Sequence, residues 1–385
     1  MTRKPLLLPG LFLCALVLAA CGATTSGSWP GLAANSDLAF VVLNQQLHAI
    51  NLSDGKQAWA FPASATANTG LFYAEPAITP EIIVLGSEGP TNSHSGILFG
   101  IDPTTHQQRW CLAFDKKGAQ RQNCPQAPNT DVTGLFGIAL PNDNRFIGGI
   151  VVTEGVAYFG LANSTIYAVD TTSGSVKWSF KAENAVWSTP FVTSHALYVT
   201  SLAHLLYALD RETGRLLWQK DLGAAIAGGA TAADGKVYVG TFGSKFYALS
   251  AETGDEIWSQ TTNNWVWTTP VVHAGLVYFG DLAGTLFALD ANTGDQKWAV
   301  TPGGRLRASP AIAGDTLYIG DEKGKFFALD LASGAQRWSQ EMKGELLTSP
   351  IVVGDLVLIA PYKGDNLLVG YTTTGALKWA FAPSK

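Results

Sequence analysis

The stretch ALDRETGRLLW, residues 208–218, recurs down the chain with unchanged spacing. ALSAETGDEIW ends at Trp258, ALDANTGDQKW at Trp298 and ALDLASGAQRW at Trp338, so successive copies are 40 residues apart. AVDTTSGSVKW ends 40 residues upstream at Trp178, and the looser copies AINLSDGKQAW, GIDPTTHQQRW and VGYTTTGALKW end at Trp59, Trp110 and Trp379. A fixed period of this length indicates a repeat architecture, in which one unit cannot bury its apolar face alone.

Each repeat contains four short β-rich runs. In the repeat at 185–218 these runs cover 188–192, 196–200, 205–210 and 215–219, with turn residues between them. This pattern is typical of a four-stranded antiparallel meander. A four-stranded unit repeated every ~40–45 residues is typical of a β-propeller blade. The eight copies therefore predict an all-β fold, an eight-bladed β-propeller of four-stranded antiparallel blades.

The tryptophan that ends each copy carries a large apolar face toward the neighbouring blade. The glycine four residues before it in most copies suits a turn that needs positive φ, and the aspartate that precedes this turn can accept hydrogen bonds from its amides. The phrase resembles the tryptophan-docking motif of the pyrroloquinoline-quinone (PQQ) repeat family, and the resemblance covers nearly the whole mature chain. It implies that each of these side chains wedges between blades: Trp59, Trp110, Trp178, Trp218, Trp258, Trp298, Trp338 and Trp379.

A proline marks the start of the innermost strand in most blades, since proline is tolerated at the start of a strand. It stands at Pro76, Pro190, Pro270, Pro310 and Pro350, while Gly149 and Ala230 take its place in two other blades. Four runs lie in 29–61 and four in 347–381, so neither terminus has a spare strand. The ring is therefore predicted to close by tryptophan docking rather than by strand exchange.

The first 20 residues are predicted to be a lipoprotein signal peptide. Arg3 and Lys4 precede the apolar stretch 6–18, which is too short to span a bilayer. The stretch ends in Leu18-Ala19-Ala20-Cys21, which resembles the bacterial lipobox, and this implies that Cys21 is lipidated. Residues 21–28 then form a polar tether, and the propeller occupies 29–385. We expect an extracytoplasmic protein that is anchored by lipid to a bacterial membrane, at the outer membrane or the cell surface.

Two cysteines remain in the mature chain beyond Cys21. Cys111 and Cys124 both lie in the segment 111–147, which is predicted to be an irregular insertion between blades two and three. An extracytoplasmic compartment permits a disulfide between them. Long loops of this kind are often functional. Neither cysteine has a histidine at zinc-ligand spacing, so no metal site is predicted.

The charge balance argues against nucleic acid as a partner. Removal of the signal peptide leaves 25 − 2 = 23 basic residues against 30 acidic ones, a net charge of −7, and no basic stripe is present. The six histidines are scattered, without metal spacing or a catalytic context. No glycine-rich phosphate loop occurs. We therefore predict no catalytic residue and no bound cofactor.

Three functions are compatible with the pattern. Quinoprotein alcohol dehydrogenases of the PQQ-repeat family bind PQQ and Ca²⁺ on the propeller axis, and many carry two adjacent cysteines, which this chain lacks. A minimal eight-bladed lipoprotein instead resembles the BamB-like group of outer-membrane assembly scaffolds, which implies an envelope protein as partner, contact with the membrane through the lipid anchor alone, and no enzymatic activity. A surface protein that binds carbohydrate or peptide through the axial funnel is the third alternative.

The residues just before the proline mark predict what lines this funnel. The position three before it is held by Tyr73, Phe146, Trp187, Ala227, Trp267, Arg307 and Leu347 in blades two to eight. Two residues earlier, Trp265 and Arg305 would share the same face if the segment alternates as a strand does. Aromatic residues with arginines on a concave surface are typical binding anchors, which makes the candidates Tyr73, Trp187, Trp265, Trp267, Arg305 and Arg307. The alternative is that these side chains merely plug the channel and stack on one another.

Overall fold

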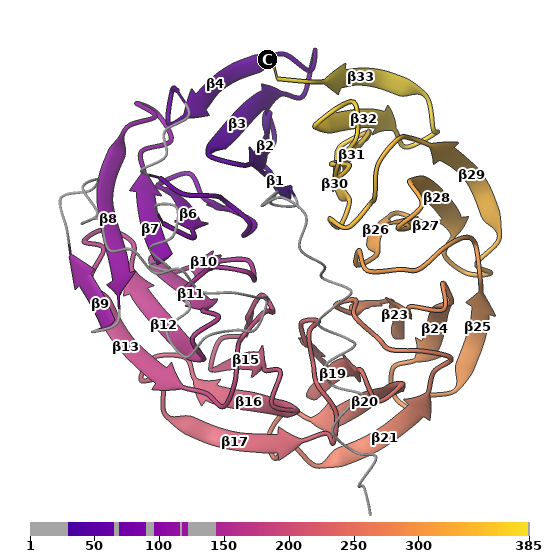
Figure 1. Cartoon of the computed structure of the whole chain (residues 1–385). Helices are drawn as coiled ribbons and strands as arrows, with labels where there is room; N and C mark the ends of the chain where they lie inside the picture. Colours follow the sequence, from indigo (N-terminus) through magenta and orange to yellow (C-terminus); the bar gives the residue numbers. More distant parts are fainter. Residues whose placement is uncertain (1–29, 65–68, 90–95, 116–117, 122–143, 384–385) are drawn as a thin grey trace, which may run out of the picture.

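Eight antiparallel sheets surround a common axis in chain order, like the blades of a propeller (Figure 1). The computed structural model describes residues 30–64, 69–89, 96–115, 118–121 and 144–383. Every blade is a meander whose strands pair in sequence order, so the first strand lies nearest the axis and the last at the outside. The predicted all-β, eight-bladed propeller is confirmed. No helix in the described part of the chain is long and apolar enough to cross a membrane.

The strands of the eight blades have the following bounds. The first four blades contain β1 (Gly31–Ala34), β2 (Leu38–Leu43), β3 (Gln46–Asn51) and β4 (Gln57–Phe61); β5 (Ala77–Ile78), β6 (Ile83–Ser87), β7 (Gly96–Ile101), β8 (Gln108–Asp115) and β9 (Gly118–Arg121); β10 (Val151–Thr153), β11 (Val156–Gly160), β12 (Thr165–Asp170) and β13 (Val176–Lys181); β14 (Phe191–Val192), β15 (Ala196–Thr200), β16 (Leu205–Asp210) and β17 (Leu216–Asp221). The last four contain β18 (Thr231–Ala233), β19 (Lys236–Thr241), β20 (Lys245–Ser250) and β21 (Glu256–Thr261); β22 (Val271–His273), β23 (Leu276–Gly280), β24 (Leu286–Asp290) and β25 (Gln296–Val300); β26 (Ala311–Ala313), β27 (Thr316–Gly320), β28 (Lys325–Asp330) and β29 (Gln336–Glu341); β30 (Ile351–Val353), β31 (Leu356–Ile359), β32 (Leu368–Thr372) and β33 (Leu377–Phe381).

The recurring phrase forms the third strand, a tight turn and the start of the fourth strand. In blade four, Asp210 Oδ1 accepts hydrogen bonds from the backbone N–H and the hydroxyl of Thr213, at 2.8 and 2.7 Å. Gly214 follows with φ of +71°, a conformation that glycine adopts without strain. A Cβ at Gly214 would lie 2.5 Å from the ring of Trp178 in the preceding blade. The glycine is therefore required both by the turn and by the tryptophan that packs on it.

The tryptophans latch successive blades together. Trp258 Nε1 donates to the carbonyl of Ala291 in the next blade at 3.2 Å, and Tyr238 of its own blade donates to the same oxygen at 2.9 Å. A carbonyl oxygen has two lone pairs, so it can accept both bonds. The same arrangement occurs in four further blades, where a tryptophan and a tyrosine of one blade both donate to one carbonyl of the next. The tryptophans in these blades are Trp178, Trp218, Trp298 and Trp338.

The core is divided among the interfaces between blades. Eight clusters of buried apolar side chains each combine residues from two neighbouring blades. Blades eight and one share one of them, which contains Leu32, Leu358 and Trp379. Trp379 Nε1 donates to Leu52 of blade one at 2.8 Å, and Thr348 donates to the Pro30 carbonyl. The ring therefore closes by tryptophan docking, as predicted, and each terminal blade is built from consecutive strands.

Blade two differs from the prediction. β8 continues past Trp110 to Asp115, and β9 pairs with it, so the blade has five strands. The start of the segment predicted to be an irregular insertion is thus sheet, because its apolar residues Cys111, Leu112 and Phe114 continue the buried pattern of the strand. Cys111 is disulfide-bonded. The signal peptide, Cys21, the tether and Cys124 lie outside the described residues, so the lipid anchor and the Cys111–Cys124 pairing stay predictions.

Candidate functional site

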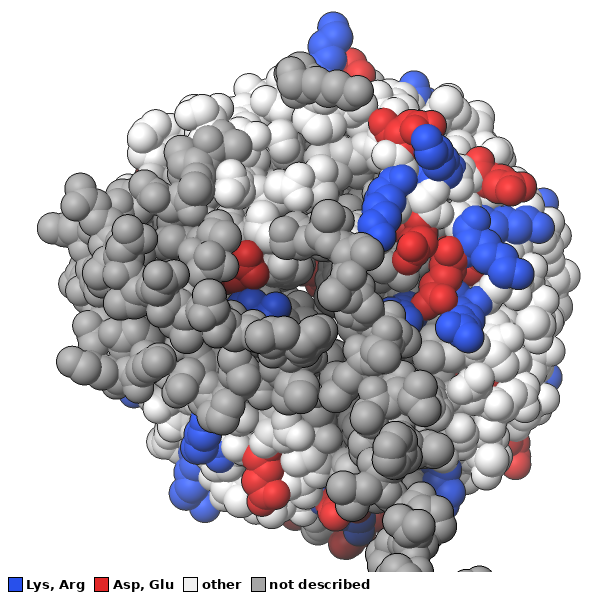
Figure 2. Space-filling view, viewed as in Figure 1, with Lys and Arg blue, Asp and Glu red and all other residues white. Residues whose placement is uncertain are grey.

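The segments that lead into the first strands surround a cavity of about 400 Å³ on the propeller axis. These segments occupy equivalent positions in different blades, because the first and second strands pair in the same register. Phe191 pairs with Tyr198 in blade four, and Val271 pairs with Tyr278 in blade six. Residues one and three positions before the proline mark contribute to the lining in most blades. The volume lies within the ~300–1,000 Å³ typical of small-molecule pockets. Figure 2 views the molecule along this axis.

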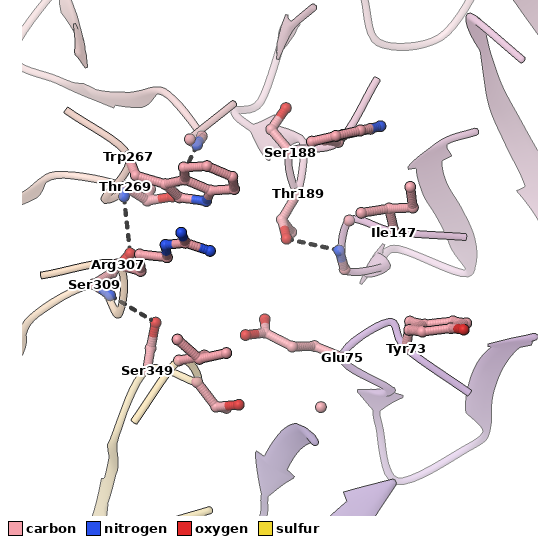
Figure 3. A pocket seen from close by; sticks show the side chains of 18 of the residues that line it. Tyr73, Glu75, Ile147, Ser188, Thr189, Trp267, Thr269, Arg307, Ser309 and Ser349 are labelled. Atoms are coloured by element: carbon pink, nitrogen blue, oxygen red, sulfur yellow. Dashed lines mark hydrogen bonds between the residues drawn. The ribbon is translucent and has the colours of Figure 1, made fainter. Parts of the chain in front are cut away.

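Four of the six predicted funnel residues line this axial cavity: Tyr73, Trp187, Trp267 and Arg307. The guanidinium of Arg307 lies over the Trp267 ring, 4.7 Å from its centroid. Arg307 Nε is 2.5 Å from Glu322 Oε1, a contact that lacks hydrogen-bond geometry and is therefore electrostatic. Cation–π attraction and the ion pair together hold this arginine against the wall (Figure 3).

The other two predicted residues do not line the cavity. Trp265 stacks on Phe242 with ring centroids 5.0 Å apart, and Phe242 also contacts Trp267 at 5.2 Å. Arg305 is exposed. Trp267 therefore lines the cavity whereas Trp265 does not, because residues 263–270 precede β22 and are not in strand conformation. Phe242 was not predicted, because it lies in the hairpin between β19 and β20 and not in a segment before an inner strand.

The proline mark was misplaced in blade three. Val151 pairs with Tyr158 as Phe191 pairs with Tyr198, so Ile150 rather than Gly149 occupies the proline position. Ile147, not Phe146, consequently lines the cavity. Phe146 is fully buried between blades two and three, where its ring contacts Phe114. Blade three has no proline to fix the phase, which explains the shift by one residue.

A belt of hydroxyl groups joins blades inside the cavity. The backbone N–H of one blade donates to a Ser or Thr oxygen at the equivalent position of the next, and the bonds are Gly149 to Thr189 at 2.8 Å, Gly229 to Thr269 at 2.9 Å, Thr269 to Ser309 at 2.8 Å and Ser309 to Ser349 at 3.0 Å. Figure 3 shows several of these bonds along the wall. Each hydroxyl still has a second lone pair and its own proton available. The cavity wall is therefore polar at this level.

Glu75 occupies the position of this belt in blade two, and the sequence reasoning missed it. The dipeptide Glu75-Pro76 stands where other blades have Thr189-Pro190 or Ser309-Pro310, so alignment of the proline marks could have revealed a carboxylate in place of a hydroxyl. Its side chain is half-buried at the cavity wall, and burial raises the pKa of the Glu75 carboxyl to about 7. Burial, followed by the charge of Glu88, also raises the pKa of the neighbouring Tyr73.

Comparison with known proteins places the fold in a family. The sequence profile of the family described as "Outer membrane protein assembly factor BamB" matches residues 139–219, 203–306 and 284–384. The chain belongs to this family. A comparison with curated protein sequences found no match. Among solved structures, BamB from Moraxella catarrhalis has a TM-score of 0.66 at 15% identity, with 88% of this chain and 96% of that chain covered.

Two further solved structures share the fold of this family member. The computationally designed protein Ika8 has a TM-score of 0.70 at 13% identity, with 93% of this chain and 97% of that chain covered. Quinohemoprotein alcohol dehydrogenase from Comamonas testosteroni has a TM-score of 0.68 at 13% identity, with 94% and 76% covered. At such identities the likeness extends to the fold alone, so both an assembly factor and an oxidoreductase are compatible with it.

The residues at the axis do not fit PQQ and calcium. PQQ carries three carboxylates, whereas the charged groups among the described lining residues are Arg307, which Glu322 already neutralises, and the carboxyl of Glu75. Oxygen-rich sites suit Ca²⁺, yet the described residues contain no group of three or more His, Cys, Asp or Glu side chains that could hold a metal ion. The donor set therefore suits neither the quinone nor its metal.

Proposed function

We propose that this chain is a non-catalytic binding scaffold of the cell envelope, lipid-anchored through Cys21 to the outer membrane or cell surface. The family match supports the assignment, because its description concerns an outer-membrane protein assembly factor. The axial residues support the absence of catalysis, because they suit neither PQQ nor calcium. A quinoprotein dehydrogenase is therefore the weaker alternative.

The docking surface of this scaffold is the aromatic rim, which we define as Phe242, Trp265, Trp267 and Arg307. The ring of Phe242 contacts both indoles, and Arg307 packs on that of Trp267. The indoles of Trp265 and Trp267 are only half-buried. Clustered Trp and Arg residues at the edge of a hollow are the residues that dominate binding free energy in protein interfaces. This cluster is the observation that carries the proposal.

The charges around the rim favour a protein partner over nucleic acid. Figure 2 shows Lys and Arg interleaved with Asp and Glu on this face over blades seven and eight. Two ion pairs lie there, Arg307 with Glu322 at 2.5 Å and Lys343 with Asp365 at 2.7 Å. Mixed charge of this kind specifies the orientation of a protein partner, whereas nucleic acid binding requires a field of one sign.

Photo-crosslinking in intact cells tests the rim. A photoreactive residue at position 265 is expected to capture a specific envelope protein, and Trp265→Ala together with Trp267→Ala should abolish co-purification of that protein in mild detergent. The matched control is Leu217→Ala with Ile257→Ala, which removes two large apolar side chains that are 42% and 47% exposed on the outer strands. Retention of the partner by the folded rim variant would overturn the docking surface. Cys21→Ser should release the folded propeller from membranes, and its retention there in high salt would overturn the anchor.

A further inference from the structure

The carboxyl of Glu75 lies in the axial cavity, and none of the described residues supplies a countercharge to it. Figure 3 shows it pointing into the cavity, between Ser349 and Thr189, rather than toward the backbone of its own blade. The cation that shares the cavity, Arg307, is already engaged by Glu322 and Trp267. Burial is the one cause that shifts the pKa of Glu75, with no contribution from a nearby charge. An ionised carboxylate in such a place is costly unless a cation pairs with it.

The groups around Glu75 suit an ammonium ion better than a metal ion. An ammonium has three N–H donors, and besides Glu75 the hydroxyl oxygens of Thr189 and Ser349 each retain a lone pair after accepting one backbone N–H. Calcium requires six to eight oxygen ligands and usually several carboxylates, whereas Glu75 is the single acidic residue among the described residues that line the cavity. The indole of Trp187, which also lines the cavity, adds an aromatic group of the kind that attracts organic cations.

A second unsatisfied group indicates that the ligand also carries an acceptor. Among the described residues, Nε1 of Trp187 is buried and has no hydrogen-bond partner. Buried indole N–H groups usually find a partner, and Trp187 lines the same cavity as Glu75. A molecule that places an amine at Glu75 and a hydroxyl or carbonyl oxygen at Trp187 would satisfy both groups at once.

We propose that the axial cavity is a binding site for a protonated primary amine, whose ammonium pairs with Glu75 and whose oxygen-bearing body contacts Trp187. The amine comes either from a free small molecule such as an amino sugar or from a lysine side chain of a bound peptide. This site adjoins the aromatic rim and shares Trp267 and Arg307 with it, but its two defining groups, Glu75 and Trp187, are not part of the rim. The proposal therefore goes beyond the docking function and can fail independently of it.

Calorimetric titration of the purified mature protein at pH 8 tests the site with two matched pairs of probes. Glucosamine is compared with N-acetylglucosamine, and a lysine-containing tripeptide with the same peptide acetylated at the lysine nitrogen. We expect at least one amine to bind ten-fold or more tightly than its acetylated partner, because acetylation removes the positive charge. Binding by glucosamine alone identifies a free amine as the source, and binding by the peptide alone identifies a lysine side chain.

Two variants assign the binding to Glu75. Glu75→Gln keeps the size of the side chain and should weaken the binding of the amine at least ten-fold. Glu345→Gln is the control, since this carboxylate lies two residues before the cavity-lining Leu347 and is not part of the lining. Equal binding of amine and acetylated probe, no binding of either amine, or undiminished binding by Glu75→Gln would each overturn the proposal. Stronger binding of Ca²⁺ than of the amines would overturn it as well.

Discussion

At the outer wall of the propeller a tryptophan recurs in all eight blades, whereas at the axis only the position recurs and the side chain changes. At the wall, each of seven tryptophans donates to a carbonyl of the next blade, and Trp59 instead stacks on His106 with centroids 4.3 Å apart. At the axis, the equivalent positions carry an aromatic ring in blade six, an arginine in blade seven and a leucine in blade eight, at Trp267, Arg307 and Leu347.

The difference follows from what each position must satisfy. A tryptophan at the wall meets the same turn in every neighbouring blade, so the same side chain is required each time. A side chain at the axis faces an open cavity, and no neighbour dictates its identity. Departures from the repeat at the axis therefore carry the information about ligands, and Glu75 is the clearest of them because a carboxyl replaces a hydroxyl there.

Removal of a wall tryptophan should have the largest effect. Trp298→Ala and Trp379→Ala should each lower the free energy of unfolding by about 3–5 kcal/mol, the cost of truncating a large buried aromatic side chain. The two indoles are equally enclosed, with 9% and 8% exposed, and both donate to the next blade. Urea denaturation of both variants measures the cost.

Trp379 sharpens the comparison because its copy of the phrase is degenerate, which predicts a smaller role unless closure of the ring depends on it. Trp379 lies where the ring closes, between blades eight and one, so we expect the full cost. A cost for Trp379→Ala well below that for Trp298→Ala would mean that closure depends on other contacts, such as the bond from Thr348 to Pro30. Trp265→Ala, at the rim, is the control and should cost less than either.

The wall could be predicted from sequence because its determinants are local. An eleven-residue phrase contains the strand, the turn and the docking side chain, so its recurrence predicts strand order, blade number and closure. Blade two was the exception, because nothing in the phrase indicates that β8 extends beyond its tryptophan and pairs with β9.

The axis could be predicted only in part. Tyr73, Trp187, Trp267 and Arg307 were found because they keep a fixed distance from the start of the inner strand. Trp265 and Arg305 were misassigned because strand alternation does not apply to the irregular segments before β22 and β26. Phe242 comes from a hairpin of a different blade, and its contact with Trp265 depends on packing that no local pattern encodes.

Replacement of Glu75 should give an effect of intermediate size that depends on pH. The pKa of about 7 in the folded protein lies above the ordinary value of 4.5, so the folded state retains the proton longer than the unfolded state does. Stability from this group is fully present below pH ~4.5 and is lost as pH rises through about 7, a change of about 3 kcal/mol at most. The side chain of Glu75→Gln does not titrate, so the variant does not lose stability in this way as pH rises.

The measurement is the difference in unfolding free energy between Glu75→Gln and the unaltered protein, determined without amines from pH 4 to pH 8. The variant should gain relative stability steadily between about pH 4.5 and pH 7 and remain level above that range, since other titrating groups cancel in the difference. A difference that stays flat would mean that the carboxylate is already compensated inside the cavity. That result would mean that the fold itself already satisfies the Glu75 carboxylate, as it satisfies the tryptophans of the wall.

Loss of one hydroxyl from the axial belt should have the smallest effect. Ser309→Ala removes the acceptor for the backbone N–H of Thr269, which lies 2.8 Å away, while the backbone N–H of residue 309 can still donate to Ser349 Oγ. A net hydrogen bond contributes ~1 kcal/mol to stability, and water in the cavity can take over part of that role. We therefore expect a loss of about 1 kcal/mol in urea denaturation, several-fold less than at Trp298. A loss as large as that for Trp298→Ala would mean that the hydroxyl belt contributes as much to the contact between blades as the wall tryptophans do. The residues at the axis would then be fixed by stability and would not be free to vary with the ligand.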